Sequence, residues 1–226
     1  DIRIVSVRGR WCRPQRYYDM AAWRGTYSHD GGAIANQSIH HVDLLRYLCG
    51  DVARVNAQMR TLGADIEVED TVVATFTYGD DAVGNLEVTT AARPDDFEAS
   101  LSIVGSKGLA MIGGIAVNEL QIFTPSPDEC AAHSEDFIGI KGHGAVYGHG
   151  HSEMYSDIVR HFSGEAPYPG DRDDCLGTIK LLHAFYRSDE AGGWVDVDCD
   201  EQSPRMGRAN EKISALYRYP ATGEDA

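Results

Sequence analysis

The sequence predicts an α+β fold: a large, mainly antiparallel, open-faced β-sheet with helices packed on one face. From Val52 to Phe123 apolar residues recur with a period of two, which is typical of strands. Short turn-like links separate the segments of this stretch, and short links favour antiparallel neighbours. Segments with helical spacing flank it, and each carries an apolar side that it can bury against one face of the sheet. The other face is then free for a partner.

A first strand is expected at Ile2–Val7, where apolar and polar residues alternate. Six more are expected as successive strands of one meander, at Val52–Leu62, Thr71–Tyr78, Ala82–Thr90, Ala99–Val104, Leu109–Ile112 and Leu120–Phe123. Turn residues fill the links at 79–81, 93–96 and 105–108. One more short strand is expected at Trp194–Val197.

Helices are expected on both sides of the strand region. The first opens at the glycine pair Gly31-Gly32 and ends at Cys49-Gly50, because glycine commonly ends a helix. Two more are expected at Ser152–Phe162 and Arg172–Ser188, after a long irregular loop over residues 124–150. We therefore expect one α+β domain over residues 1–200 and an irregular tail over residues 201–226.

Composition limits the classes of function. A net charge of -15 over 226 residues argues against nonspecific nucleic-acid binding, because phosphates require a basic surface. The five cysteines are scattered and form no Cys-x-x-Cys pair, which predicts reduced thiols rather than a disulfide framework or structural zinc. No apolar run reaches the roughly 20 residues that cross a bilayer, and the first residues lack the layout of a signal peptide. We expect a cytoplasmic protein that contacts no membrane.

The helix after Gly31-Gly32 carries chemical groups on one side. Neighbours on a helix lie three and four residues apart, so Asn36, His40, Asp43 and Tyr47 are expected to follow one another along that side. Imidazole is the natural proton carrier near neutral pH. The helix would therefore present His40 with an amide and a carboxylate beside it. The alternative is a partly buried histidine that only satisfies its own hydrogen bonds.

Six motifs in series carry a resemblance to a known family. They are Trp23-Arg24-Gly25, Gly31-Gly32, His40-x-x-Asp43-Leu44-Leu45, Glu69-Asp70-Thr71, Val104-Gly105-Ser106-Lys107-Gly108 and Ala184-Phe185-Tyr186-Arg187-Ser188. From Ile2 to Val197 the chain resembles the C-terminal domain of the glucose-fructose oxidoreductase and inositol dehydrogenase family (Gfo/Idh/MocA). The resemblance implies a substrate-binding and oligomerisation domain that works beside an N-terminal Rossmann domain holding NAD or NADP.

This sequence contains no convincing dinucleotide fingerprint. The glycine-rich stretch Gly142–Gly148 has the wrong final spacing and lacks the surrounding strand-helix-strand unit. We therefore expect a domain without its Rossmann partner, which by itself binds NAD or NADP only weakly and does not turn over.

The resemblance assigns chemistry to the first helix. His40 matches the histidine of the family motif and would act as general base when a sugar hydroxyl is oxidised. Asn36 stands where the family has an aspartate. Since an amide cannot exchange a proton, Asn36 would hold a substrate hydroxyl. Together with Gln37 it resembles members that oxidise nucleotide-linked sugars such as UDP-N-acetylhexosamine uronates. Asp43 would orient His40 or lie in the pocket.

Trp23 and Arg24 resemble a family pair that packs against the nicotinamide end and the phosphates of the cofactor. An arginine fork suits phosphate geometry. The alternative is an aromatic and arginine cap on the loop.

The loop before residue 152 supplies further candidates. Tyr147, His149 and His151 are expected to contact substrate at the start of the following helix, whose amides can receive an anion. Histidines also suggest a metal site, but no carboxylate or thiolate completes a recognisable spacing, so we expect no metal. Loop histidines without a role are the other alternative.

The leading hypothesis is the substrate-binding and oligomerisation domain of an NAD(P)-dependent sugar or nucleotide-sugar dehydrogenase. It would form a homodimer or homotetramer through the open face of its sheet. The alternative is a noncatalytic scaffold or sugar-binding oligomerisation domain. A metal-dependent hydrolase that uses the histidine loop is a third possibility.

Overall fold

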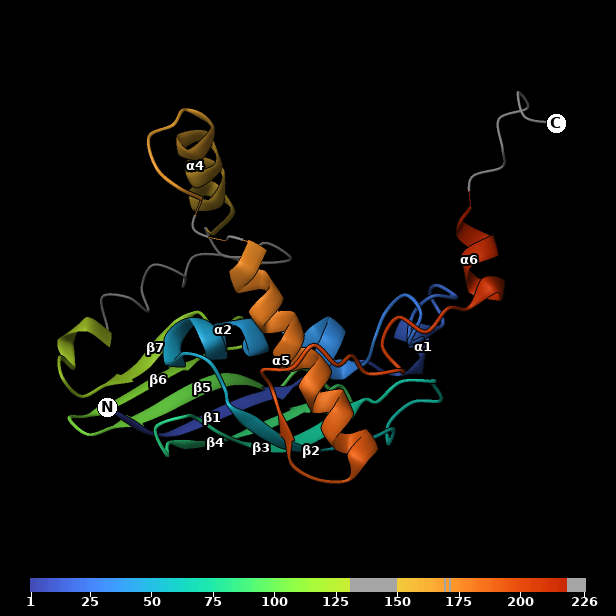
Figure 1. Ribbon diagram of the computed structural model, residues 1–226, viewed down its shortest axis with the longest axis horizontal. Coiled ribbons are helices and arrows are strands. Elements are labelled where there is room, and N and C mark those ends of the chain that lie inside the picture. Colours follow the sequence, from blue (N-terminus) through green and yellow to red (C-terminus); the bar gives the residue numbers. More distant parts are fainter. Residues whose placement is uncertain (131–149, 169, 171, 219–226) are drawn as a thin grey trace.

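Helices cover one face of a β-sheet, and the opposite face is bare (Figure 1). The computed structural model describes residues 1–130, 150–168, 170 and 172–218. Within these residues eight strands form one sheet in the order β7-β6-β5-β1-β4-β3-β2-β8. Neighbouring strands are antiparallel, except that β1 and β4 run parallel. The predicted α+β class with a mainly antiparallel, open-faced sheet is confirmed.

The elements agree closely with the predicted segments. The strands are β1 (Ile2–Arg10), β2 (Arg54–Arg60), β3 (Thr71–Thr77), β4 (Val83–Thr89), β5 (Glu98–Gly105), β6 (Leu109–Gly113), β7 (Glu119–Phe123) and β8 (Val195–Asp196). The helices are α1 (Gln15–Tyr18), α2 (Ile39–Cys49), α4 (Gly150–Phe162), α5 (Arg172–Ala191) and α6 (Glu211–Tyr217), with a π-helical turn η1 at Ala33–Gln37. Most of the loop expected over residues 124–150 lies outside the described residues.

The strand order differs from the single meander that was predicted. β2, β3 and β4 form one meander and β5, β6 and β7 another, but β1 lies between them. Residues 90–97 pass around the end of β1, where the amide of Trp11 donates to the carbonyl of Thr89 at 2.8 Å and that of Phe97 to Arg10 at 2.8 Å. Val5 and Val7 are fully buried, so β1 needs a hydrogen-bonded neighbour on both edges. A position inside the sheet, between β5 and β4, gives β1 a hydrogen-bonded neighbour on each edge.

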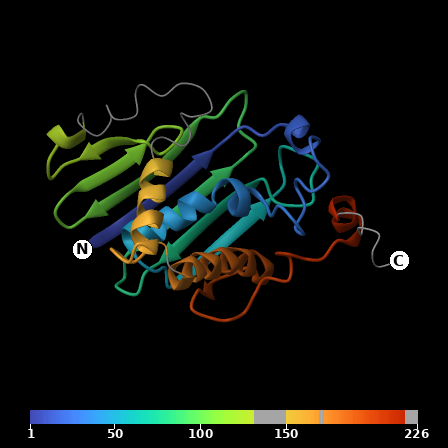
Figure 2. The same ribbon diagram turned by 90° about the horizontal axis from the view of Figure 1, so that it is seen from above.

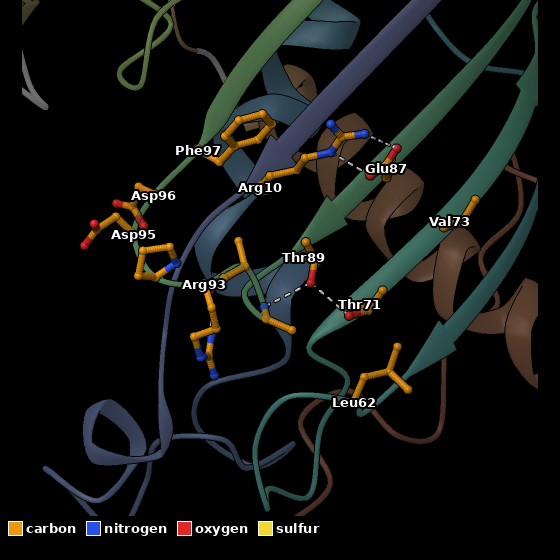
Figure 3. Close-up of a pocket in the computed structure, with 13 residues that line it drawn as sticks. Arg10, Leu62, Thr71, Val73, Glu87, Thr89, Arg93, Asp95, Asp96 and Phe97 are labelled. Carbon is orange, nitrogen blue, oxygen red and sulfur yellow. Dashed lines mark hydrogen bonds and ion pairs between the residues drawn. The ribbon is translucent and has the colours of Figure 1, made fainter.

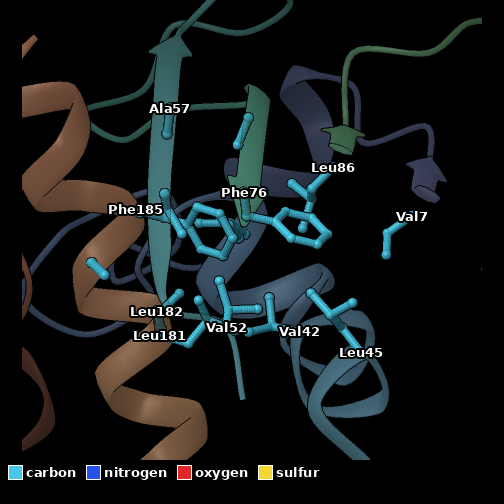
Figure 4. Packing of buried hydrophobic residues seen from close by; sticks show 14 of the residues in the cluster. Val7, Val42, Leu45, Val52, Ala57, Phe76, Leu86, Leu181, Leu182 and Phe185 are labelled. Atoms are coloured by element: carbon cyan, nitrogen blue, oxygen red, sulfur yellow. The ribbon is translucent and has the colours of Figure 1, made fainter. Parts of the chain in front are cut away.

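The core lies between the sheet and two helices (Figure 4). Phe76 and Leu86 project from the sheet, and α2 covers them with Val42 and Leu45. From α5, the fully buried Phe185 packs against the same cluster. Burying each such side chain contributes on the order of 2 kcal/mol. In Figure 2, α2 crosses the middle of the sheet while α5 runs along its β2 side.

A polar contact fixes α2 against α5. Arg46 donates to the hydroxyl of Thr178 at 2.9 Å, and that hydroxyl donates to Asp43 at 2.7 Å. Arg46 also pairs with Asp51 at 2.7 Å. A Cβ at Gly177 would overlap the Arg46 guanidinium, so glycine leaves the space that this contact needs.

The bare face of the sheet mixes apolar and charged side chains. Ile4, Val73 and Val83 are about half exposed on it, because they alternate with the buried residues of their strands. Beside them Arg10 forms a bidentate ion pair with Glu87 at 2.7 and 2.8 Å.

The last described segment is more ordered than the irregular tail that was predicted. Arg205 pairs with Asp189 and Glu190 of α5 at 2.9 and 2.8 Å, and residues 211–217 form helix α6. Ser203 and Arg205 of this segment thus find partners on α5. None of the helices in the described part of the chain is long and apolar enough to cross a membrane.

His41 is one of the polar side chains buried in the protein. It is 2% exposed between α2 and β1, and its ring centroid lies 5.3 Å from that of Trp11. Neither ring nitrogen has a hydrogen-bond partner among the described residues. Burial lowers the pKa of His41 to about 4.

His41 should make the protein less stable in acid. The unfolded chain takes up a proton near pH 6.5, whereas the folded protein takes it up only near pH 4. The His41 contribution is therefore complete above pH 6.5 and declines as the pH falls toward 4, by about 3 kcal/mol. Urea unfolding of the wild type and of His41→Phe across this range measures it. The free energy of unfolding of the wild type, relative to that of His41→Phe, should decrease as the pH falls from 6.5 toward 4. A difference that does not vary with pH would contradict the lowered pKa of His41.

Candidate functional site

The candidate site begins at a glycine pair whose two members serve different purposes. Gly31 has a φ of +71°, a conformation that favours glycine. Gly32 has an ordinary extended backbone but lies against the buried carboxyl group of Glu69. A Cβ at Gly32 would overlap all three atoms of that group. The sequence predicted a glycine turn here, while the packing reason for Gly32 appears only in the structure.

The first predicted helix is interrupted. η1 ends at Gln37, and α2 begins at Ile39. Within η1 the amide of Ser38 donates to the carbonyl of Ala33, five residues earlier. Asn36 therefore does not continue the α-helical row of His40, Asp43 and Tyr47 that the sequence predicted. Its place is set by the π-helical turn, which places extra residues in one turn and so shifts the side-chain register.

Asn36, Gln37 and Arg24 are nevertheless brought together by two residues that the sequence reasoning missed. The Gln37 side-chain amide donates to the Tyr17 hydroxyl at 3.0 Å and to Asn36 at 2.8 Å. Arg24 lies over the ring of that same tyrosine, 4.2 Å from its centroid. On the other side Asn36 donates to Asp30. The signal in the sequence was weak: Tyr17 lies in an arginine- and aromatic-rich loop, and Asp30 directly precedes the glycine pair.

Asp30 connects this group to the loop before it. Its second carboxylate oxygen accepts from the amide of Gly25 at 2.5 Å. Burial raises the pKa of Asp30, while the hydrogen bonds from Gly25 and Asn36 act in the opposite direction. The carboxylate thus fixes the distance between the Trp23-Arg24 segment and η1.

Arg24 is held between two aromatic rings. Its guanidinium lies 4.2 and 4.8 Å from the ring centroids of Tyr17 and Trp23, so aromatic faces support it on two sides. Its Nε is buried without a hydrogen-bond partner, and the ion pairs of the described residues do not include it. A cation held in this way is suited to a phosphate.

His40 lies at the surface of a pocket of about 330 Å³. The exposed Tyr47 and Asp43 lie beside it, and residues 115–117 contribute an apolar wall. The ring is therefore accessible to a small molecule, in contrast to its neighbour His41. The alternative of a partly buried histidine does not describe His40, whose side chain is exposed.

Asp43 does not orient His40 by a hydrogen bond. Its carboxylate accepts from Thr178 of α5, as described above, and no hydrogen bond between Asp43 and His40 is present among the described residues. Asp43 lines the same pocket, so of its two predicted roles the second agrees with the geometry.

Of the predicted contacts in the histidine loop, the described residues include only His151. Tyr147 and His149 lie outside the described residues. His151 is exposed on α4, which stands away from the sheet and from α2 in Figure 1. Among the described residues, no group of three histidine, cysteine or acidic side chains is arranged to bind a metal ion.

A second hollow, of about 570 Å³, lies on the bare face of the sheet (Figure 3). Thr71, Thr89 and the Arg10–Glu87 pair line its floor, with Phe97 and residues 93–96 at its rim. Because Arg10 and Glu87 already satisfy each other, this hollow presents no free charge from that pair to a ligand. It has no histidine, and we do not assign it to the chemistry.

Comparison with known proteins confirms the family resemblance. Residues 1–111 match the family model described as the GFO/IDH/MocA C-terminal domain. The curated levoglucosan dehydrogenase of Pseudarthrobacter phenanthrenivorans is 27% identical over 146 residues, which make up 53% of this chain and 37% of that protein.

Solved structures share the fold over most of the chain. The WlbA dehydrogenase from Bordetella pertussis, solved with NADH and UDP-GlcNAcA, matches with a TM-score of 0.80 and 37% sequence identity. The match covers 88% of this chain and 57% of that one. A levoglucosan dehydrogenase solved with NADH and levoglucosan has a TM-score of 0.70 at 22% identity, over 87% of this chain and 59% of that one, and shows the fold alone. This chain thus spans somewhat more than half the length of these structures.

Gly32→Ala should destabilise the protein by about 1–3 kcal/mol, because the new methyl group must displace the Glu69 carboxyl group in a packed interior. Gly79→Ala is the matched control, since a Cβ there meets nothing within 4 Å and its φ is not positive. Thermal and urea unfolding of both variants provide the measurement. Equal stability of the two would show that Gly32 is not confined by Glu69.

Proposed function

We propose, because residues 1–111 match the GFO/IDH/MocA C-terminal domain model, that this chain is the substrate-binding and oligomerisation part of an NAD(P)-dependent dehydrogenase. Its substrate would be a sugar, and specifically a nucleotide-linked sugar. The 37% identity to a dehydrogenase solved with UDP-GlcNAcA supports the nucleotide-linked class over levoglucosan, whose dehydrogenase is 22% identical in the structural match.

The observation that carries this proposal is the accessible imidazole of His40. It lies on a rigid helix, fixed to α5 through Arg46 and Thr178, at the surface of a pocket of about 330 Å³. A general base must reach the proton that it removes, and rigid elements hold such a base more precisely than loops.

The chemistry of His40 would be proton transfer. When a sugar carbinol is oxidised, the hydroxyl proton passes to the imidazole as the hydrogen on the same carbon leaves with its electron pair. A nicotinamide, when bound, supplies the acceptor for that hydride. Asn36 and Gln37 would hold neighbouring hydroxyl groups, because each amide retains unused hydrogen-bonding capacity beyond the bonds described above.

Trp23 and Arg24 fit the cofactor role that the resemblance implies. The buried, unpartnered Nε of Arg24 is a donor without an acceptor, and a phosphate oxygen would satisfy it. The ring of Trp23 beside it offers a flat apolar surface. Tyr147, His149 and His151 remain predicted substrate contacts.

The bare sheet face is the proposed oligomer interface. Ile4, Val73 and Val83 expose apolar surface on a flat sheet that lacks a covering layer, and such surfaces commonly mark association sites. Their mixture with ion pairs such as Arg10–Glu87 gives the polar surroundings that an interface of this kind carries.

Replacing His40 should abolish catalysis in the protein of full natural length. We expect His40→Gln to lower kcat for UDP-GlcNAcA oxidation by about 10²–10⁴-fold, the range that a general base contributes. Formation of NADH, followed by its absorbance, provides the measurement. His29→Gln is the control, because His29 is exposed and contacts Ser28 rather than the pocket.

The same assay separates the alternatives. A scaffold or sugar-binding domain would show no oxidation in the wild type, and equal rates for the wild type and His40→Gln would remove His40 from the mechanism. Residues 1–226 alone should bind NAD weakly by calorimetry and should not oxidise sugar. Robust NAD-dependent turnover by these residues alone would contradict the proposed division of labour.

Light scattering tests the oligomer. The wild type should be a dimer or tetramer, and the double variant Val73→Lys/Val83→Lys should shift toward monomer, because two charges would have to be desolvated in the interface. Leu216→Lys on α6 is the control, since it places the same charge on an exposed helix away from the sheet. A wild type that stays monomeric at high concentration would refute the interface.

A further inference from the structure

A buried acid that the proposed chemistry does not use lies directly beneath the site. Glu69 precedes β3 and is 3% exposed. One carboxylate oxygen accepts from the Tyr186 hydroxyl at 2.8 Å and from the amide of Ile34 at 3.3 Å. The other oxygen is buried and has no hydrogen-bond partner among the described residues. A buried oxygen left unsatisfied costs free energy, so the position of this side chain requires an explanation.

Glu69 and Tyr186 together take up three successive amides at the start of η1. The amide of Gly32 donates to the Tyr186 hydroxyl at 3.2 Å. That of Ala33 donates to the backbone carbonyl of Glu69 at 2.9 Å, and that of Ile34 to its carboxylate. These amides have no partner within their own helical turn, so an outside acceptor decides where the turn begins. We call this group, Glu69, Tyr186 and the amides of residues 32–34, the Glu69 cluster.

The cluster transmits its position to the candidate site through the backbone. The carbonyl of Gly32 accepts from the amide of Asn36 at 2.9 Å, and that of Ala33 accepts from Ser38 at 2.9 Å. Fixing residues 32–34 therefore fixes the residues that carry the Asn36 and Gln37 amides. Gly32 also packs directly against the Glu69 carboxyl group, so the turn cannot shift toward Glu69.

Tyr186 connects the cluster to the body of the protein. It is fully buried on α5, and Arg205 lies over its ring, 5.6 Å from the centroid. Glu69 lies two residues before β3, an interior strand of the sheet. The turn is thus held between a strand of the sheet and the long helix that covers it.

We propose that Glu69 and Tyr186 are positioning residues, which hold η1 so that Asn36 and Gln37 face the sugar in a single fixed geometry. This inference rests on the proposed dehydrogenase function, because it assigns the cluster a role in the same site. Neither residue touches the reacting atoms. Displacing substrate-holding groups by about 1 Å can cost on the order of a hundredfold in rate.

The charge state of Glu69 suits this role. Burial raises its pKa to about 7, so near neutral pH a large fraction of Glu69 carries a proton. The groups that face it are Tyr186 of α5, Tyr27 of the preceding loop and Arg205 of the last segment, and only Arg205 is charged at this pH. Glutamine mimics the protonated carboxyl group in shape and keeps the accepting oxygen. Glu69→Gln should therefore preserve the cluster.

The test uses four variants of the protein in its full natural length. Glu69→Ala removes the carboxylate that accepts from the Tyr186 hydroxyl and the Ile34 amide. Tyr186→Phe removes the hydroxyl that accepts from the Gly32 amide. Glu69→Gln keeps an accepting oxygen at position 69. Ser188→Ala is the matched control. Its hydroxyl lies on the same helix, is fully buried, and likewise accepts one amide, that of Ala57 at 2.8 Å, and donates once, to Gly193 at 2.6 Å.

Two readouts are measured for each variant. The first is kcat and KM for UDP-GlcNAcA oxidation, and the second is hydrogen-exchange protection of the amides of residues 32–34. Glu69→Ala and Tyr186→Phe should lower kcat/KM by about 10–100-fold and lose protection at these amides. Glu69→Gln should stay within about threefold of the wild type, and Ser188→Ala should keep both readouts at similar overall stability.

The outcomes separate the two proposals. If Glu69→Ala loses no more kcat/KM than Ser188→Ala at matched stability, the positioning role is overturned. If protection of residues 32–34 is unchanged in Glu69→Ala, the cluster does not hold the turn, and the inference fails whatever the activity. If the wild type oxidises no sugar, the proposed function fails, and the exchange data alone then decide whether the cluster fixes η1.

As a further readout, pH distinguishes the buried acid from a purely steric effect. A raised pKa in the folded protein means that the stabilising contribution is complete below pH 4.5 and is lost as the pH rises through about 7. The denaturation midpoint of the wild type should therefore fall between pH 5 and 7 relative to that of Glu69→Gln. Parallel profiles would show that Glu69 does not titrate in this range.

Discussion

The pairing of β1 on both of its edges is the constraint from which the rest of the architecture follows. This strand joins two meanders, one built from β2, β3 and β4 and the other from β5, β6 and β7, into one sheet. Its inward residues Val5 and Val7 lie at the centre of the core, and α2 packs across it. Gly9 of β1 lies close to the start of that helix, where a Cβ would come within 3.3 Å of the Ser38 hydroxyl. The position of His40, two residues after Ser38, is therefore set by the middle of the sheet.

The site combines a rigid part with a part held by polar contacts. α2 is anchored by apolar packing and by Arg46 and Thr178, so His40 gains its position from the core. η1 buries Ala33 and Ile34 in the core and is held in addition by hydrogen bonds to Glu69, Tyr186 and Asp30. Buried polar networks cost stability unless they are fully satisfied, and one oxygen of Glu69 has no partner in the part of the chain that the structure describes. Active sites are where such a cost is commonly tolerated.

Burial, more than charge pairing, sets the titration behaviour of this core. His41 resists protonation and Glu69 resists ionisation, since both are removed from water. Between about pH 4.5 and 6.5 the stabilising contribution of His41 increases with pH, whereas that of Glu69 decreases with pH. Near pH 7 His41 is therefore neutral and Glu69 is only partly ionised, although the chain as a whole carries a net charge of -15.

By itself the sequence determined the α+β class, nearly every strand and helix, and the candidate His40, because side-chain periodicity and glycine turns are local properties. It also indicated the family through six short motifs. Only the tertiary structure decided that β1 lies inside the sheet and that Asn36 leaves the helical row of His40. It also decided that Tyr17, Asp30, Glu69 and Tyr186 form hydrogen bonds with residues 32–37. These facts depend on contacts between residues such as Glu69 and Tyr186 that are 117 positions apart. Local spacing contains no information about which distant donor will meet which acceptor.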